Sequence, residues 1–327
     1  MRTITVQNVN QALVEGFAWL RVAGVKENSR NGPVLVAPYP VCTTYLRPWE
    51  RVLFNPVRDA NPVFHLMEAI WMLSGENDAD FLLPFNSKFV QYAEDDGIVH
   101  GAYGFRWREH FKLDQISAII TILANDPQSR QAVMQMWDCD ADLGAKKRDI
   151  PCNTHIYFDC RGGMLNMTVC CRSNDILWGA YGANAVHMSV LQEVIAAGVG
   201  IPMGDYRQFS NNFHAYTNND TVQHFLDNGV VDYDVYGMGV NSMPLIGSLE
   251  SVGMFLADCE LLVTARDEID VPVFNTKFFN DIAYPLFSAY LARKGGQGIA
   301  RSDFTAEQRG NDWVVAFLDW CDRRSEK

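Results

Sequence analysis

The sequence predicts one compact α+β domain over residues 1–327, of which about residues 245–327 form a helical C-terminal extension. Three observations favour this class. Apolar and polar residues alternate through the middle of the chain, as they do in paired strands. Apolar residues recur at helical spacing before and after that region. No internal repeat, low-complexity tract or linker divides the sequence into separate units.

The first part of the chain predicts two helices and a strand. Residues 8–23 have apolar positions at helical spacing, and the turn-forming cluster 28–33 is expected to end that helix. Residues 34–46 are expected to form a strand and a crossing loop. Pro62 then opens a strongly apolar helix over 63–73, because proline is favoured in the first turn of a helix.

The second part of the chain combines strands with helices. The alternating stretches that we expect to pair as strands are 130–138, 154–160 and 164–171. Helical spacing predicts the remaining helices, which are 115–123, 184–198 and, in the extension, three helices near 250–265, 278–292 and 305–323.

Composition excludes several classes of protein. A formal net charge of −12 argues against nucleic acid as a partner, since proteins that bind it carry a basic footprint. None of the eight cysteines forms a Cys-x-x-Cys pair, so no metal site is expected. No apolar run approaches the length of a membrane span or a signal peptide. We therefore expect a cytoplasmic protein with free thiols and no membrane partner.

The most informative pair of residues is Cys152, in Asp149-Ile150-Pro151-Cys152-Asn153-Thr154, and Arg172. A lone cysteine is usually a small core residue, and an arginine at a strand end is usually solvated. Cys152 follows a proline at the expected start of a strand, where a side chain can face a cleft. A nearby arginine lowers the pKa of a thiol and offers a fork of donors to a phosphate. The pair suggests attack by a thiolate on a phosphorylated small molecule.

Other polar residues stand in unusual places. Glu68 lies within the apolar helix over 63–73, where burying a carboxylate is costly. His214 and Tyr216 are spaced to project from one face of a strand. Arg130 follows the turn Asp126-Pro127-Gln128-Ser129, and Ser173 and Asp175 are common turn or cap residues. Taken singly, none of these residues decides a function.

Taken in order, these segments resemble the thymidylate synthase superfamily, which includes the phage deoxycytidylate and deoxyuridylate hydroxymethylases. The resemblance covers about residues 28–220. The segments that carry it are Arg30 in the early turn, Glu68 in Glu-Ala-Ile-Trp-Met-Leu-Ser-Gly, Tyr103 in Gly-Ala-Tyr-Gly, Arg130 in Asp-Pro-Gln-Ser-Arg, Pro151-Cys152, Arg172-Ser173-Asn174-Asp175, and Asp205 to His214 with Tyr216.

The resemblance implies a thymidylate synthase-like fold, with a large twisted mixed sheet flanked by helices. It also implies that Cys152 adds to C6 of a pyrimidine, so that C5 can attack the one-carbon unit of 5,10-methylenetetrahydrofolate. Glu68 would move protons at the ring edge, Tyr103 would belong to the catalytic site, and Asp175 would contact the folate.

For substrate binding, the resemblance implies a clamp around the 5′-phosphate of a 2′-deoxynucleotide. Arg30, Arg172 and Ser173 would supply it, together with Arg130 from the second subunit of a homodimer. His214 and Tyr216 would bind the sugar hydroxyl.

Several positions depart from the synthase pattern. Asn153 replaces a histidine, Gln131 replaces an arginine, and Phe89 stands where a folate-facing tryptophan is usual. No closing C-terminal tail is recognisable in 313–327. Because a synthase must keep water away from its intermediate whereas a hydroxymethylase delivers water to it, we favour hydroxymethylation. The Asn174 that follows Ser173 is also typical of the phage hydroxymethylases.

The choice between dUMP and dCMP stays open on the sequence. The base-reading residue follows Gly179, and asparagine there suits uracil whereas aspartate suits cytosine. The loop is one residue longer than usual. If the loop absorbs the extra residue, Asn184 reads the base; otherwise Ala183 occupies the position, and His187 or a water takes the role.

Two other functions remain possible on the sequence: an ordinary thymidylate synthase that makes dTMP, and an inactive nucleotide-binding relative. Retention of Cys152, Glu68 and Arg172 speaks against the second. A phage origin, with location in the host cytoplasm, rests on the resemblance.

Overall fold

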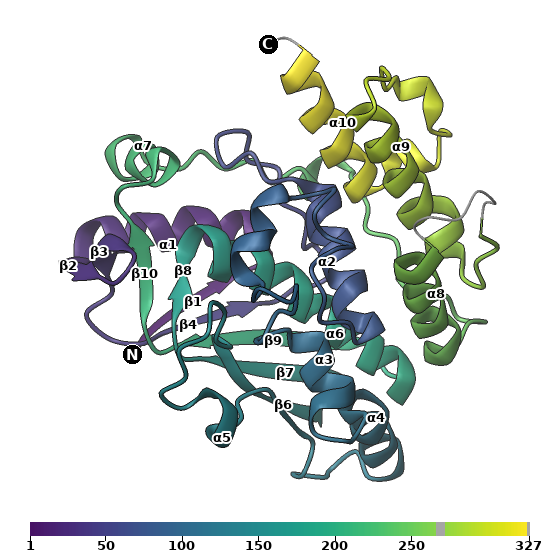
Figure 1. Cartoon of the computed structure of the whole chain (residues 1–327), viewed down its shortest axis with the longest axis horizontal. Helices are drawn as coiled ribbons and strands as arrows, with labels where there is room; N and C mark the ends of the chain where they lie inside the picture. The colour runs from purple at the N-terminus through teal and green to yellow at the C-terminus, as the bar shows by residue number, and fades with distance from the viewer. Residues whose placement is uncertain (266–271, 326–327) are drawn as a thin grey trace.

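The computed structural model describes residues 1–265 and 272–325, and its centre is a six-stranded mixed sheet. The strands lie in the order β1-β4-β9-β7-β6-β5 (Figure 1). Their bounds are β1 Arg2–Val6, β4 Val41–Tyr45, β5 Val133–Gln135, β6 Asn153–Arg161, β7 Met164–Cys171 and β9 Met203–Ser210. β1 is parallel to β4 and β7 is parallel to β9, whereas the other neighbours are antiparallel. The expected large mixed sheet is confirmed.

A second, four-stranded sheet has the order β2-β3-β10-β8. Its strands are β2 Val25–Ser29, β3 Gly32–Val36, β8 Asn174–Asp175 and β10 Phe213–Tyr216. β10 lies between β3 and β8, and its register pairs His214 with Asp175. β10 therefore joins β3, near the start of the chain, to β8, which directly follows the end of β7.

Helices cover the large sheet in successive layers. α6 (Asn184–Val199) contacts β7 and β9 and is buried over most of its length. α2 (Pro62–Ser74) contacts α6, so α6 lies between α2 and the sheet. Before the C-terminal extension, the other described helices of four or more residues are α1 Val9–Ala23, α4 Gln115–Asn125, α5 Cys139–Asp142 and α7 Asp220–Asn228, with short helical segments η1 Ser87–Tyr92, η2 Arg106–His110 and η3 Ile176–Ala183.

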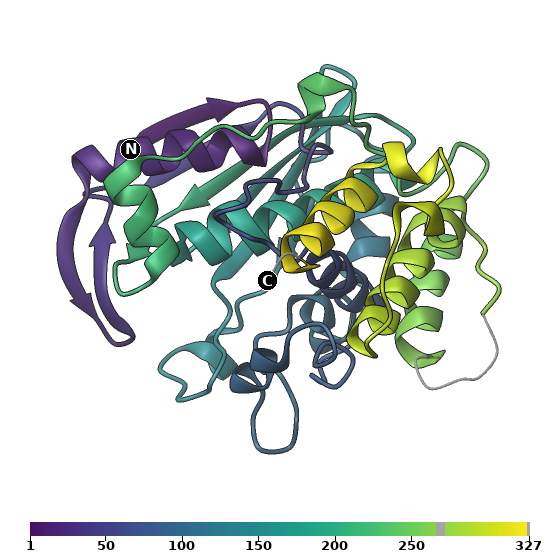
Figure 2. The ribbon, with the colours of Figure 1, turned by 90° about the horizontal axis from the view of Figure 1, so that it is seen from above.

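The C-terminal extension is helical, as expected, and gathers beside α2. Its helices are α8 Val252–Thr264, η6 Phe279–Ala283 continued by α9 Tyr284–Lys294, and α10 Asp312–Ser325. Figures 1 and 2 both show this group on the side of the molecule opposite the small sheet. Both α8 and α10 contact α2.

Several local expectations need correction. The helix over 8–23 ends at Gly24, where the backbone becomes extended, and β2 follows; the cluster 28–33 instead turns β2 into β3. Strand pairing extends over only three residues of 130–138, because the amides of Met136 and Trp137 both donate to the Thr154 carbonyl oxygen and so break the regular ladder with β6. Residues 34–46, expected as one strand and a crossing loop, belong instead to two strands, β3 and β4, in different sheets. In addition, β1, β2, β8 and β9 were not predicted, although β9 alternates half-buried and buried positions.

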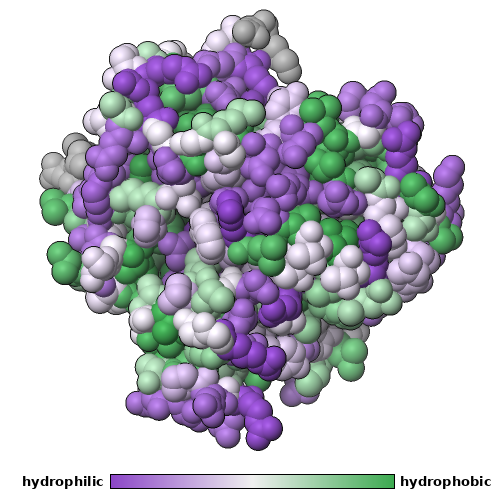
Figure 3. All heavy atoms as spheres, turned by 180° about the vertical axis from the view of Figure 1, so that it is seen from behind, coloured by the Kyte–Doolittle hydropathy of each residue, from purple (hydrophilic) through white to green (hydrophobic). Residues whose placement is uncertain are grey.

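On the face in Figure 3, hydrophilic and hydrophobic residues are interspersed. Within residues 1–265 and 272–325, no helix combines the length and the hydropathy that a membrane crossing requires.

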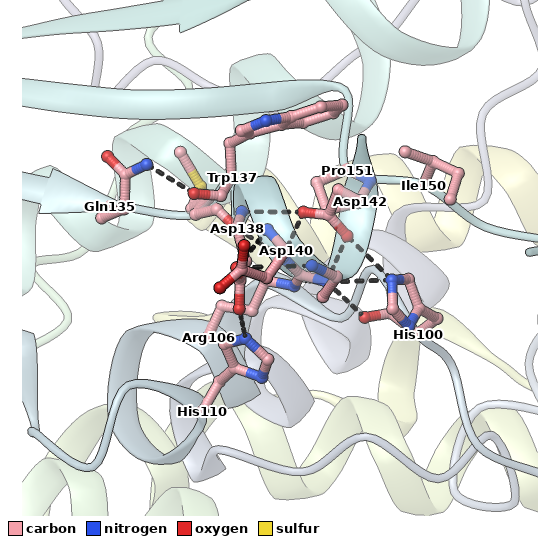
Figure 4. Close-up of polar contacts among 12 residues, drawn as sticks. His100, Arg106, His110, Gln135, Trp137, Asp138, Asp140, Asp142, Ile150 and Pro151 are labelled. Carbon is pink, nitrogen blue, oxygen red and sulfur yellow. Dashed lines mark hydrogen bonds and ion pairs between the residues drawn. The ribbon is translucent and has the colours of Figure 1, made fainter. Parts of the chain in front are cut away.

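A buried ion pair joins the segment after Tyr103 to the segment before Cys152 (Figure 4). Arg106 is fully buried and donates to Oδ2 and Oδ1 of Asp142 at 2.6 and 2.9 Å. It also donates to the carbonyl oxygens of Met136 and His100. His100 adds a 2.8 Å contact to Asp142. A bidentate charged pair of this kind fixes the orientation of the two segments that carry its partners, and removing one partner leaves a buried charge.

We expect Arg106→Met to destabilise the protein by about 3–5 kcal/mol, because Asp142 would remain buried without its counterion. Urea unfolding followed by circular dichroism measures the change. The control is Arg161→Met, which removes an exposed partner of Asp159 and should cost less than about 1 kcal/mol. Equal effects of the two substitutions would contradict a structural role for the buried pair.

Candidate active site

A cavity of about 820 Å³ brings together seven of the twelve residues that the sequence singled out. Those seven are Glu68, Phe89, Tyr103, Cys152, Ser173, Asp175 and Asn184. They come from α2, η1, the start of α3 (Tyr103–Phe105), the loops flanking β6 and β7, β8 and the start of α6. The volume lies in the range of pockets that enclose small molecules.

One face of α2 forms the long wall of this cavity. Its lining residues are Asn61 at the N-cap, then Phe64, His65, Glu68, Trp71 and Met72. Their spacing of three or four residues is that of a single helix face. With a rise of about 1.5 Å per residue, the wall is roughly 16 Å long.

Tyr103 fixes the backbone at the cysteine. Its hydroxyl oxygen accepts hydrogen bonds from the N–H groups of Cys152 and Asn153, both at 3.1 Å. Tyr103 reaches this place because Gly104 packs directly on α2, where a Cβ atom would lie 1.8 Å from the carbonyl oxygen of Met72. The phenol supports the loop that presents the thiol.

Arg172 acts on the same loop from outside the cavity lining. Its guanidinium donates to the carbonyl oxygens of Pro151 at 2.8 Å and Ile150 at 2.9 Å, and it lies over the ring of Trp137. Burial raises the pKa of the Cys152 thiol, the Arg172 cation lowers it, and the Asp149 carboxylate raises it. Arg172 therefore favours the thiolate and also positions it.

Two titratable groups face each other deeper in the cavity. Burial, helped by the nearby Asp149, raises the pKa of Glu68 to about 8, so the carboxyl is largely protonated at neutral pH. Burial lowers the pKa of His187 to about 3, so that imidazole is neutral. Oε2 of Glu68 lies 3.4 Å from Nε2 of His187, yet neither atom has a hydrogen bond within the part of the chain that the structure describes. Unpaired buried groups of this kind are typical of sites that hold water or ligand.

A chain of amides holds Asn184 in one orientation. Nδ2 of Asn153 donates to Oδ1 of Asn184 at 2.8 Å, and Nδ2 of Asn184 donates to Oδ1 of Asn174 at 3.0 Å. Asn174 in turn donates to Gln208 and to Ser210. Because each amide has its oxygen and nitrogen assigned by its neighbour, Asn184 cannot flip without breaking two bonds.

Gly179 allows this chain to form. A Cβ atom at Gly179 would lie 2.6 Å from Oδ1 of Asn174, which is the acceptor of the bond from Asn184. The irregular segment η3 also bends at Tyr181 and Gly182, where the backbone is not helical. After this bend, both Ala183 and Asn184 line the cavity.

Five predicted residues lie outside the cavity lining. Arg30 is exposed at the β2–β3 turn, and Arg130 is exposed before β5. Arg172 is exposed beside the cysteine loop. His214 and Tyr216 stand on β10, with their rings 5.1 Å apart. Asn31, next to Arg30, donates to the Tyr216 hydroxyl at 3.4 Å, so the small sheet brings Arg30 and Tyr216 to one end.

Part of the cavity lining is aromatic. Phe89 is buried and contacts Phe64, Trp71 and Tyr92. Asp175 lines the cavity with a raised pKa caused by burial, and its Oδ2 has no hydrogen bond from the described residues. Aromatic rings with a few convergent polar groups suit a flat heterocycle such as the pterin of a folate. These residues therefore fit the expected one-carbon donor.

Sequence reasoning missed several residues that line the cavity or hold its lining in place. Asp149, which perturbs the pKa values of both Glu68 and Cys152, lies three positions before the cysteine, and that proximity was the available signal. His65, Gln208 and Ser210 gave no signal, because only the packing of α2 on α6 and of β9 beside β7 brings them to the site. Across residues 1–265 and 272–325, no cluster of three or more potential metal ligands is present.

Comparisons with known proteins find a family model and named relatives that this chain resembles. The family model described as "Thymidylate synthase" matches residues 58–229, more than half of the chain. A deoxyuridylate hydroxymethyltransferase of Pseudomonas phage M6 is 42% identical over 99% of this chain and 95% of its own. One of Bacillus phage SP01 is 33% identical over 54% of this chain and 49% of its own. A putative thymidylate synthase of Methanothermobacter marburgensis is 37% identical over 38% of this chain and 56% of its own.

We expect Arg172→Gln to move the alkylation of Cys152 by iodoacetamide to higher pH, because removing the cation leaves burial and Asp149 to raise the thiol pKa. Peptide mass mapping across a pH series separates Cys152 from the other cysteines. Arg172→Lys retains the charge and should shift the profile less, and Arg130→Gln is the exposed control. If the lysine and glutamine variants shift equally, the loop contacts rather than the charge set the pKa.

We expect Glu68→Gln to gain stability over the wild type as pH rises from 5 to 8. The ordinary pKa is 4.5 and the folded value is about 8, so between them the unfolded chain loses a proton that the native state keeps. Native stability therefore falls with pH, by at most about 1.4 kcal/mol per pH unit, and glutamine abolishes this loss. Urea midpoints at several pH values measure it. If the difference in urea midpoint between Glu68→Gln and the wild type does not change with pH, the raised pKa of Glu68 is refuted. We expect such a constant difference for the exposed control Glu27→Gln.

Proposed function

The chain belongs to the thymidylate synthase family and is a folate-dependent transferase, and on this premise we propose that it hydroxymethylates C5 of dUMP. The observation that carries the proposal is the amide chain through Asn184, which presents a neutral, fixed amide in the cavity that also holds Cys152 and Glu68.

The amide chain favours uracil over cytosine. After its bonds to Asn153 and Asn174, Asn184 keeps one N–H and one lone pair, which match the O4 acceptor and N3–H donor of uracil. An aspartate at this position would place a carboxylate oxygen against Oδ1 of Asn174. Both atoms are acceptors, so no hydrogen bond could form between them. The surroundings of Asn184 are therefore built for an amide, the base reader that suits dUMP.

Covalent attack is assigned to Cys152. Its thiolate adds to C6 of the ring, which gives C5 the electron density to form a carbon–carbon bond. Tyr103 holds the backbone of the thiol and Arg172 favours its ionised form. Glu68, protonated at neutral pH, is suited to donate a proton at the ring edge and to take it back. 5,10-Methylenetetrahydrofolate supplies the one-carbon unit when bound beside Asp175 and Phe89.

The phosphate is assigned to the arginines near the small sheet. Arg30, Arg172 and Ser173 would bind it from one protomer, with Arg130 from the second protomer of a homodimer. His214 and Tyr216 would bind the deoxyribose hydroxyl. In support, Arg30 and Tyr216 lie at one end of the small sheet, and Arg130 is exposed.

Hydroxymethylation rather than methylation is supported by the Glu68–His187 pair. Two buried polar atoms 3.4 Å apart and without hydrogen bonds among the described residues offer partners for a water molecule. A water there is what a hydroxymethylase must deliver and what a synthase must exclude.

Mass spectrometry tests the proposal directly. dUMP and dCMP are each incubated with the protein and 5,10-methylenetetrahydrofolate. We expect dUMP to gain a hydroxymethyl group, one oxygen atom heavier than dTMP, without formation of dihydrofolate. A methyl product with dihydrofolate would identify a synthase, and unmodified nucleotides would refute transferase activity on both. Loss of turnover with retained nucleotide binding in Cys152→Ala would exclude an inactive relative.

We expect Asn184→Asp to lower kcat/KM for dUMP by at least about tenfold and to raise the ratio of dCMP to dUMP turnover, because the carboxylate cannot donate to O4 or to Asn174. Competition between the two nucleotides, read by product mass, measures the ratio. The control is Asn228→Asp on the exposed face of α7, which should leave it unchanged. An unchanged ratio in Asn184→Asp would assign base reading to another residue.

A further inference from the structure

The cavity continues beyond the residues that the family comparison explains. Besides the catalytic residues, it is lined by Tyr290 of α9 and by Trp320 and Arg324 of α10. All three belong to the C-terminal extension, which lies outside the matched region 58–229. A segment that merely stabilised the core would have no need to reach the ligand cavity.

The extension is tied to the far end of the α2 wall. Asn61, the N-cap of α2, donates to the Tyr290 hydroxyl at 3.1 Å. The Tyr290 ring lies 5.7 Å from that of Trp320, and the Arg324 guanidinium lies 3.9 Å above the Trp320 ring. Glu68 is seven residues along α2 from Asn61, which is roughly 10 Å. The residues of the extension that contact Asn61 therefore lie roughly 10 Å along α2 from Glu68.

Cations gather at this outer end although the chain as a whole is strongly acidic. Asp59 accepts a bidentate pair of bonds from Arg324 at 2.9 and 2.6 Å and further bonds from Arg323. Arg323 and Arg324 thus face the single carboxylate of Asp59, which leaves an excess of positive charge.

The acidic neighbours on α10 do not cancel this excess. Asp319 and Asp322 lie beside Arg324 in the sequence, but both pair with Arg301. Asp59 itself has a φ of +47°, a left-handed conformation that is uncommon for residues other than glycine. The backbone is held in that conformation where its carboxylate clamps the two arginines.

We propose that the C-terminal extension builds the outer half of the folate site, with Tyr290 and Trp320 against the aminobenzoyl ring and Arg323 and Arg324 receiving the glutamate carboxylates. A folate consists of a pterin, an aromatic spacer and a dianionic glutamate in line. The cavity is lined by groups that match each part: Asp175 and Phe89, the rings of Tyr290 and Trp320, and the Arg324 guanidinium. This inference rests on the proposed folate-dependent function.

The test compares two ligands that differ only in the glutamate. Binding of tetrahydrofolate and of tetrahydropteroate, which lacks glutamate, is measured by isothermal titration calorimetry with dUMP present. We expect the wild type to bind tetrahydrofolate more tightly than tetrahydropteroate. Arg324→Gln combined with Arg323→Gln should weaken tetrahydrofolate by about tenfold and leave tetrahydropteroate unchanged.

Two further variants keep the result interpretable. Arg309→Gln removes an exposed arginine of the same extension and should bind both ligands as wild type does. Trp320→Leu should weaken both ligands alike while dUMP binding, measured separately, is retained. Equal affinity of wild type for the two ligands, or no change in the arginine variant, would overturn the inference. If wild type binds neither ligand, the proposed function fails, which is a distinguishable outcome.

Discussion

The two hydrogen bonds that the Tyr103 hydroxyl accepts from the amides of Cys152 and Asn153 are the constraint on which the site depends. They link α3 to the first residue of β6, so the thiol and the start of the amide chain move as one unit. Their geometry is fixed from both sides. Gly104 seats α3 directly on α2, and the buried Arg106–Asp142 pair ties the next turn to the segment before the cysteine.

Burial then determines the chemistry of the groups around the thiol. Glu68 lies on an apolar helix packed against α6, and the loss of solvation leaves its carboxyl protonated and His187 neutral at the same pH. Outside the cavity lining, Arg172 offsets part of the penalty that burial imposes on the Cys152 thiolate. Neutral buried groups beside the thiol, with exposed arginines nearby, suit a reaction on a neutral ring that carries a phosphate.

Asn153, directly after Cys152, has a structural role of its own. Asn153 begins a chain of amides that passes through Asn184 and Asn174 to β9. Such a chain is directional, since each donor determines the orientation of the next amide. The orientation of Asn184 is thereby coupled to three strands and does not depend on one neighbouring side chain alone.

The sequence by itself predicted the class of fold, the large helices, and Cys152 with most of its polar neighbours as the candidate site, because ordered local motifs and apolar periodicity are properties of short segments. α2, α6 and the strands β6 and β7 lie where periodicity predicted them. Tertiary structure alone decided which of those residues share a cavity. Asp149 acts on Glu68 through space, Gln208 reaches Asn174 only because β9 lies beside β7, and Trp320 reaches the ligand cavity only because α10 packs on α2. These contacts join residues far apart along the chain, and no periodicity or local motif encodes how distant segments are brought together.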